Sequence, residues 1–128
     1  MRILLDTHAF LWFVAADPRL SRRAEEALRH GDNELLLSMA SVWEIAIKVG
    51  IGRLPLSEPL ETFIPEQLQL NRIGLLPIQL SHTLSVARLP LHHRDPFDRL
   101  IIAQALLEDL PLVSGDGELD SYPIQRLW

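Results

Sequence analysis

The stretch RILLDTHAFLW, residues 2–12, decides the fold class of this chain. Residues 3–5 form a short apolar run that predicts a buried β-strand, and residues 8–15 continue as an apolar helix. Asp6 lies where the strand ends and the helix begins. In parallel α/β sheets this junction is the edge at which ligands bind, although a carboxylate there also serves as a helix N-cap. Asp6 is therefore the first candidate functional residue.

Short apolar strands and helices alternate along the rest of the sequence, without an internal repeat or a linker. This alternation predicts one α/β domain over residues 1–128, with a central, mostly parallel sheet covered by helices on both faces. The further strands are expected at residues 34–38, 75–79, 110–114 and 123–128. The further helices are expected at residues 21–30, 39–50 after a Ser38 cap, 59–71 with a break or kink at Pro65, 81–89, and from Pro96 onward after an Asp95 cap.

Composition narrows the chemistry. The 128 residues are 48% hydrophobic and 23% charged, which is typical of one globular domain. The absence of cysteine excludes disulfides, zinc-thiolate sites and thiol nucleophiles, so any metal must be bound by oxygen or imidazole. Asp6 and His8 interrupt the apolar segment that a signal peptide would need, and no run reaches the roughly 18 apolar residues of a membrane span, so we expect a cytoplasmic protein.

The net charge of −5 is unusual for a nucleic-acid-binding protein, because phosphate contacts usually require a basic surface. A cluster of metal-binding carboxylates would account for much of this deficit. Four arginines gather between residues 19 and 29, where a solvated helix face is favoured over a surface that follows phosphates.

Two further acids lie on predicted helices. Glu44 precedes Lys48 by four residues, and an exposed pair at this spacing contributes about 0.2–0.5 kcal/mol. The helix around Glu44 is apolar on its other sides, however, so its polar strip is unusually narrow. Asp98 follows the Asp95 cap by three residues and fits a capping box, but it shares its face with Ile101, and a carboxylate at the edge of a buried face is costly unless it is paired or bound to metal.

The predicted topology brings the acids together. Asp116, between two glycines, is by itself most simply a turn residue, but like Asp6 it follows the end of a strand. Right-handed crossovers place successive strand ends at one edge, where Asp6, Asp98 and Asp116 would meet and where the helix after the second strand would deliver Glu44. Each close pair of carboxylates repels by roughly 4 kcal/mol at an intermediate dielectric, so the cluster requires a cation. Oxygen ligands suit Mg²⁺ or Mn²⁺, which typically support phosphoryl chemistry with an activated water.

Four stretches cover the chain nearly end to end and carry a resemblance: LLDTHAFLW (4–12), SMASVWEIAIK (38–48), HHRDPFDRLIIAQA (92–105) and LVSGDGELDSY (112–122). Together they resemble the PIN domain, and within it the VapC-like toxin ribonucleases of bacterial and archaeal toxin–antitoxin pairs. The resemblance implies Mg²⁺- or Mn²⁺-dependent endonucleolytic cleavage of RNA, restraint by a cognate antitoxin, and a homodimer. It assigns the metal-binding and catalytic roles to Asp6, Glu44, Asp98 and Asp116, with Ser114 near the metal and Thr7 and Asp95 in supporting positions.

Several alternatives stay open at this point. A Mg²⁺-dependent phosphohydrolase with Asp6 as nucleophile would need a second acid where His8 stands and a lysine late in the chain, which is absent, and the same absence weakens a phospho-acceptor receiver domain. A catalytically silent PIN module that only binds a partner is the third alternative, and Asp95 could replace Asp98 in the metal shell. His92 and His93, in the loop before Asp95, could contact RNA or bind metal, but solvated loop histidines are the favoured interpretation. Core packing is the default expectation for Trp12, Phe13 and Trp43.

Overall fold

The computed structural model describes residues 1–128 and contains a single five-stranded parallel sheet with strand order β3-β2-β1-β4-β5. The first strand lies in the centre, and Leu5 is in register with Leu37 of β2 and Val113 of β4. The strands are β1 (Arg2–Leu5), β2 (Glu34–Ser38), β3 (Ile73–Leu76), β4 (Leu112–Val113) and β5 (Arg126–Leu127).

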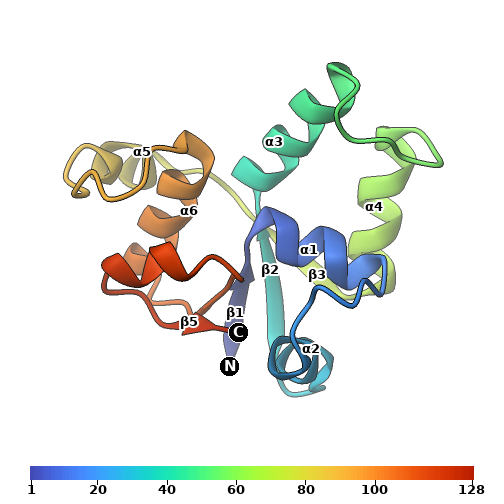
Figure 1. The fold of residues 1–128 in the computed structure, drawn as a ribbon, viewed down its shortest axis with the longest axis horizontal. Helices are drawn as coiled ribbons and strands as arrows, with labels where there is room; N and C mark the ends of the chain where they lie inside the picture. The colour runs from blue at the N-terminus through green and yellow to red at the C-terminus, as the bar shows by residue number, and fades with distance from the viewer.

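Six α-helices and one 3₁₀ helix connect the strands. Figure 1 shows α1, α3 and α4 on one side of the strands and α5 and α6 on the other, which confirms the α/β class with helices on both faces. The helices are α1 (Thr7–Val14), α2 (Arg22–Arg29), α3 (Met39–Gly50), α4 (Leu60–Leu70), α5 (Leu80–Val86), α6 (Pro96–Leu107) and the 3₁₀ helix η1 (Gly117–Ser121). No helix is both long enough and apolar enough to cross a membrane.

Two hydrophobic cores lie on opposite faces of the sheet. Ile3 and Leu5 of β1 belong to the core formed with α1, α2, α3 and α4, whereas Leu4 belongs to the core formed with α6 and η1. Successive side chains of a strand point to opposite faces, and all three of these residues are fully buried because helices cover both faces. Continuous burial of this kind explains why β1 is apolar throughout instead of alternating.

Four expected elements differ from the structure. The third strand spans Ile73–Leu76 and not 75–79, because Pro77 has no N–H to donate to the ladder and Gln79 already begins the N-terminus of α5. The last two strands are shorter than expected, with two residues each. A break at Pro65 is not found, since α4 continues through it from Leu60 to Leu70. Pro65 removes only the helical hydrogen bond to the carbonyl of Glu61, which is an exposed residue.

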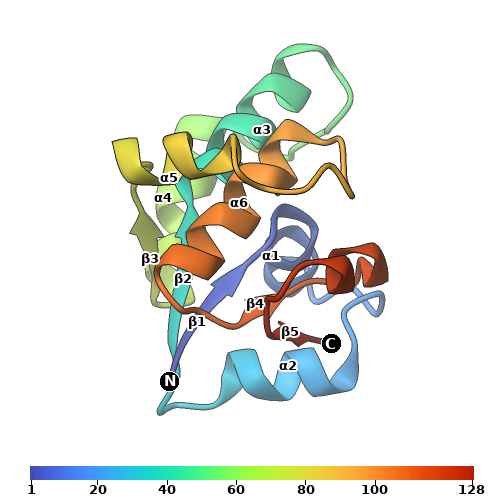
Figure 2. The ribbon, with the colours of Figure 1, turned by 90° about the vertical axis from the view of Figure 1, so that its left-hand side faces the viewer.

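Figure 2 shows the molecule from the side on which α5 and α6 lie, with η1 and β5 at its C-terminal end. The sheet order reverses at β1, because β2 lies on one side of it and β4 on the other. Such a reversal opens a crevice at the carboxyl ends of the strands. Asp6 and Ser114 directly follow β1 and β4 at this crevice.

Candidate metal centre

Asp6 begins the candidate centre at the junction of β1 and α1. Its side chain accepts a hydrogen bond from the backbone N–H of Ala9 at 2.8 Å, so it caps α1, and only 7% of the residue is exposed. Burial raises the pKa of Asp6, while hydrogen bonds from the Ser114 side chain and from Ala9 oppose this rise, and the negative charge of Glu44 adds to it. Asp6 therefore both caps α1 and lies at the sheet edge where ligands bind.

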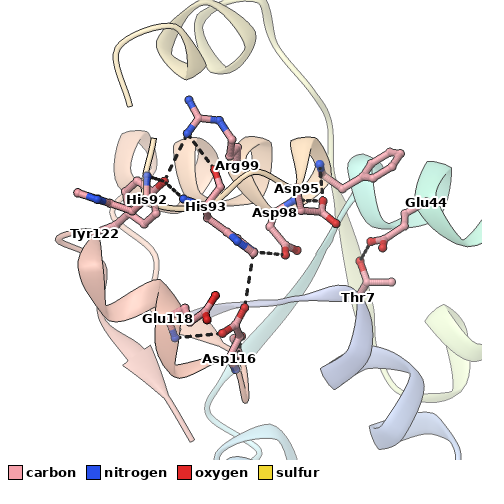
Figure 3. Close-up of polar contacts among 12 residues, drawn as sticks. Thr7, Glu44, His92, His93, Asp95, Asp98, Arg99, Asp116, Glu118 and Tyr122 are labelled. Atoms are coloured by element: carbon pink, nitrogen blue, oxygen red, sulfur yellow. Dashed lines mark hydrogen bonds and ion pairs between the residues drawn. The ribbon is translucent and has the colours of Figure 1, made fainter. Parts of the chain in front are cut away.

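Glu44 is buried on the inner side of α3, although an exposed pair with Lys48 was the simpler expectation. The ion pair exists, with Lys48 Nζ 2.8 Å from Glu44 Oε2, but the other oxygen, Oε1, accepts from the Thr7 hydroxyl at 2.6 Å. Ser41 Oγ lies 2.9 Å from the same hydroxyl. Thr7 thus links the start of α1 to α3 and fixes the position of the Glu44 carboxylate (Figure 3).

Asp95 and Asp98 have different surroundings at the start of α6. Asp95 Oδ1 accepts from the backbone N–H groups of Phe97 and Asp98 at 2.8 and 3.0 Å, which confirms the expected cap. The Asp98 side chain faces the cluster, where burial raises its pKa to about 6; a hydrogen bond with His93 opposes this rise, and the negative charges of Asp95 and Asp6 add to it. A cation bound beside this partly buried carboxylate would stabilise its charged form.

Asp116 lies between β4 and η1. Its Oδ1 accepts from the backbone N–H of Glu118 at 3.0 Å, so it caps η1, and its other oxygen, Oδ2, lies 3.6 Å from His93 Nε2 in the loop before α6. Ser114 is fully buried and accepts from the Asp116 N–H at 3.1 Å through its hydroxyl. The Ser114 hydroxyl therefore touches both Asp6 and the backbone of Asp116, and it joins the ends of β1 and β4.

His93 was expected to be solvated, and this expectation is wrong. Its Nε2 lies 2.7 Å from Asp98 Oδ2 and 3.6 Å from Asp116 Oδ2, and its side chain is only 18% exposed. Figure 3 shows the imidazole between the two carboxylates. The position of the two adjacent histidines leaves metal binding open as an alternative, but the contact with Asp98 and Asp116 depends on how the preceding loop folds.

The loop before α6 is held by two side chains that the sequence did not single out. The Tyr122 hydroxyl accepts from the N–H groups of His92 and His93 and donates to the carbonyl of Pro90 at 2.7 Å. The guanidinium of Arg99, one residue after Asp98, donates to the carbonyl oxygens of the same loop, those of Val86, Leu89, Pro90 and His93, at 3.0–3.3 Å. A single arginine that satisfies four carbonyls gives this irregular segment a defined backbone.

The ligand atoms of His93, Asp98 and Asp116 lie within 4.8 Å of one another, which is the spacing of groups that share one ion. The negative charge of Asp6 raises the pKa of Asp98, and that of Glu44 raises the pKa of Asp6, but neither residue is part of this trio. Glu44 is directed towards Thr7 and Lys48. Carboxylate oxygens with one imidazole nitrogen, partly shielded from water, fit a divalent ion of the Mg²⁺ or Mn²⁺ class.

The sequence also led to expectations for aromatic and arginine side chains outside the cluster, and the structure confirms some of them and contradicts others. Trp43 is 58% exposed, and its ring makes an edge-to-face contact with Phe97, with the ring centroids 5.1 Å apart. The expected core packing is therefore wrong for Trp43. It is correct for Phe13, which is buried. His8 is exposed beside Trp12. Three of the four arginines of residues 19–29 form surface ion pairs, in agreement with a solvated face; these pairs are Arg19–Asp17, Arg22–Glu26 and Arg29–Glu25.

Comparison with known proteins identifies the fold that carries this site. The family model of the PIN domain matches residues 3–125. The chain belongs to the PIN-domain family. Ribonuclease VapC22 of Mycobacterium tuberculosis (strain ATCC 25618 / H37Rv) is 32% identical over 122 residues, which cover 94% of this PIN domain and 91% of that protein. Ribonuclease VapC16 of the same organism is 39% identical over 56 residues, or 44% of this chain and 38% of that protein. The VapC-like resemblance is therefore confirmed.

Solved structures show the same PIN fold. VapBC2 from Rickettsia felis, bound to a DNA fragment from its promoter, aligns with a TM-score of 0.73 and 17% identity over 100% of both chains. FitAcB from Neisseria gonorrhoeae aligns with a TM-score of 0.63 and 20% identity over 98% of this PIN domain and 96% of that chain. At these identities the likeness establishes the fold of the PIN domain.

Proposed function

We propose that this PIN domain is a Mg²⁺- or Mn²⁺-dependent endoribonuclease and the toxin of a toxin–antitoxin pair. The observation that carries the proposal is the convergence of Asp6, Asp98 and Asp116 at one edge of the sheet, with Glu44 adjoining Asp6. The names of its relatives, ribonucleases VapC22 and VapC16, support RNA as the substrate.

In this proposal Asp98 and Asp116 hold the ion, and Asp6 and Glu44 add negative charge and accept protons or water hydrogen bonds beside it. Thr7 and Ser114 position these acids through the hydrogen bonds described above, and Asp95 sets the start of α6. A bound divalent ion would supply the Lewis acidity that activates water and neutralises charge on the phosphodiester.

The test is cleavage of RNA by the purified chain with Mg²⁺, with Mn²⁺ and in excess EDTA. We expect cleavage only with the metal, because a carboxylate cluster has no other means of producing hydroxide near neutral pH. Undiminished cleavage in EDTA would reject the metal mechanism. Absence of cleavage with either metal, together with tight binding of an antitoxin, would identify the chain as a silent PIN module.

The partners follow from the same reasoning. Structural neighbours such as VapBC-1 from nontypeable Haemophilus influenzae and the toxin–antitoxin complex from Klebsiella pneumoniae support a cognate antitoxin. The family resemblance also implies a homodimer. The exposed leucines Leu80 and Leu84 on α5 offer apolar surface for a second copy.

A further inference from the structure

His93 is not among the acids that the resemblance assigns to the metal, yet it is the residue that bridges two of them. Its Nε2 lies 2.7 Å from Asp98 Oδ2 and 3.6 Å from Asp116 Oδ2. Adjacent ligands of an octahedral ion with bonds of about 2.1 Å lie about 3 Å apart. The imidazole nitrogen and the two carboxylates therefore already have approximately the mutual spacing of one coordination shell.

The position of His93 is built into the fold. Its backbone N–H donates to the Tyr122 hydroxyl at 3.0 Å, and its carbonyl accepts from Arg99 at 3.3 Å. Arg99 lies on the same helix as Asp98, and Tyr122 follows the 3₁₀ helix that Asp116 caps. The two elements that carry the acids thus also hold the residue that stands between them, which distinguishes His93 from a mobile loop histidine.

We propose that the imidazole of His93 is a ligand of the divalent ion held by Asp98 and Asp116, and that this nitrogen biases the site towards Mn²⁺ over Mg²⁺. The inference rests on the proposed function only in taking a divalent ion at this cluster. On this assignment the ion would take the place of the hydrogen bond between His93 Nε2 and Asp98 Oδ2, and each of the two groups would bind the ion.

The metal preference follows from ligand chemistry. Mg²⁺ takes oxygen ligands almost entirely and loses its waters reluctantly, whereas imidazole nitrogen suits transition ions. A shell of carboxylates and water alone would not favour Mn²⁺ in this way. Replacing the nitrogen of His93 therefore weakens Mn²⁺ binding more than Mg²⁺ binding.

A simpler role for His93 would be to orient Asp98 through a hydrogen bond. Such a donor needs to reach only Asp98, but His93 Nε2 also approaches Asp116, which belongs to a different element. The substitution His93→Gln separates the two roles, because a glutamine amide can still donate to Asp98 but removes the imidazole nitrogen.

The experiment measures Mn²⁺ binding to the full-length, metal-stripped chain without RNA. Electron paramagnetic resonance counts free Mn²⁺ to give the affinity, its electron spin-echo modulation reports a directly bound nitrogen, and competition with Mn²⁺ gives the Mg²⁺ affinity. We expect nitrogen modulation in the unsubstituted protein and in His92→Gln. The matched control His92 is the adjacent histidine, and its ring packs against Tyr122 at 5.2 Å.

In His93→Gln we expect the modulation to disappear and the Mn²⁺ affinity to fall by about 10–100-fold, with a several-fold smaller loss for Mg²⁺. Bound Mn²⁺ without nitrogen modulation in the unsubstituted protein, or modulation that persists in His93→Gln, would overturn the assignment and leave the metal-dependent function standing. Absence of Mn²⁺ binding altogether would overturn both. Circular dichroism verifies the fold, and His93→Asn replaces His93→Gln if the latter does not fold.

Discussion

At the scale of single residues, Asp95 and Asp98 show how one helical turn separates a structural carboxylate from a functional one. Asp95 Oδ1 accepts two hydrogen bonds from backbone N–H groups of its own helix, at 2.8 and 3.0 Å. Asp98 instead pairs with His93 from the preceding loop, and its pKa is raised by the charge of Asp6, which follows β1. Sequence spacing showed that the two residues differ, and the contacts assign the roles.

We therefore predict opposite outcomes for Asp95→Asn and Asp98→Asn. Asparagine caps a helix as well as aspartate does, so Asp95→Asn should fold and cleave RNA almost normally, whereas Asp95→Ala should lose about 0.5–2 kcal/mol of stability. Asp98→Asn removes an anionic ligand, so cleavage should collapse. RNA cleavage and metal-free thermal unfolding, measured side by side, check both statements. An inactive Asp95→Asn together with an active Asp98→Asn would reverse the metal-site assignment.

The stability difference between Asp98→Asn and the unsubstituted protein should also depend on pH with a defined sign. The pKa of Asp98 is about 6 in the folded chain, against an ordinary value of 3.8, so the folded state holds this proton more tightly than the unfolded state. The associated stability is present below about pH 4 and is lost as the pH rises through 6. Metal-free Asp98→Asn should gain on the unsubstituted protein over this window, by on the order of 1 kcal/mol, because asparagine carries no charge to desolvate. A constant difference from pH 4 to 7 would contradict this origin.

At the scale of elements, the strand and helix order could be predicted because it depends on local patterns. The apolar run of β1, the Ser38 cap of α3 and the Asp95–Pro96 start of α6 are all visible within a few residues. Where the sequence was insufficient, the deciding contacts were distant in the chain. His93 is placed by Tyr122, 29 residues later, and Glu44 is buried because Thr7, 37 residues earlier, donates to it.

Gln104 also makes contacts with residues distant in the chain, although it lies in the apolar run LIIAQALL. Its side chain connects three parts of the fold. It is fully buried on α6, its Oε1 accepts from the Ser38 hydroxyl at the start of α3, and its Nε2 donates to the carbonyl of Pro77 before α5 at 3.2 Å. The Ser38 hydroxyl in turn accepts from the N–H of Ala40 at 3.0 Å. Gln104 therefore fixes the helix that carries Asp98 relative to the helix that carries Glu44.

We predict that Gln104→Leu lowers the free energy of unfolding by about 2–4 kcal/mol, because the Ser38 hydroxyl and the Pro77 carbonyl lose a buried partner. Ser38→Ala alone should cost about 0.5–2 kcal/mol as a lost cap. In the double variant the two losses should be less than additive, because the Ser38 hydroxyl that Gln104→Leu leaves without its partner has itself been removed. Urea unfolding of the four proteins measures the coupling, and strict additivity would show that this bond does not join the helices energetically.

At the scale of the whole molecule, the charge of −5 is distributed unevenly. The acid cluster occupies one edge of the sheet, whereas a pocket of about 600 Å³ between α1 and the segment after α3 is lined by Arg19, Lys48 and Arg53 together with Trp12. Lys48 belongs to both regions, because it lines the pocket and binds Glu44.

The last prediction concerns the antitoxin proposed above. We expect it to cover Trp12 in this pocket and the exposed Trp43, and to insert a basic side chain among the acids, where charge-assisted hydrogen bonds replace the metal. Antitoxin and Mn²⁺ should then compete, so that saturating Mn²⁺ weakens the complex and Trp12→Ala weakens it independently of metal. Titration calorimetry with the protein encoded by the neighbouring reading frame measures both effects. The matched control is Leu70→Ala, at an exposed apolar residue outside the pocket. It should change neither the affinity for the antitoxin nor the effect of Mn²⁺ on it. Additive binding of Mn²⁺ and antitoxin, or a complex whose acidic cluster stays open to solvent, would contradict the insertion of a basic side chain.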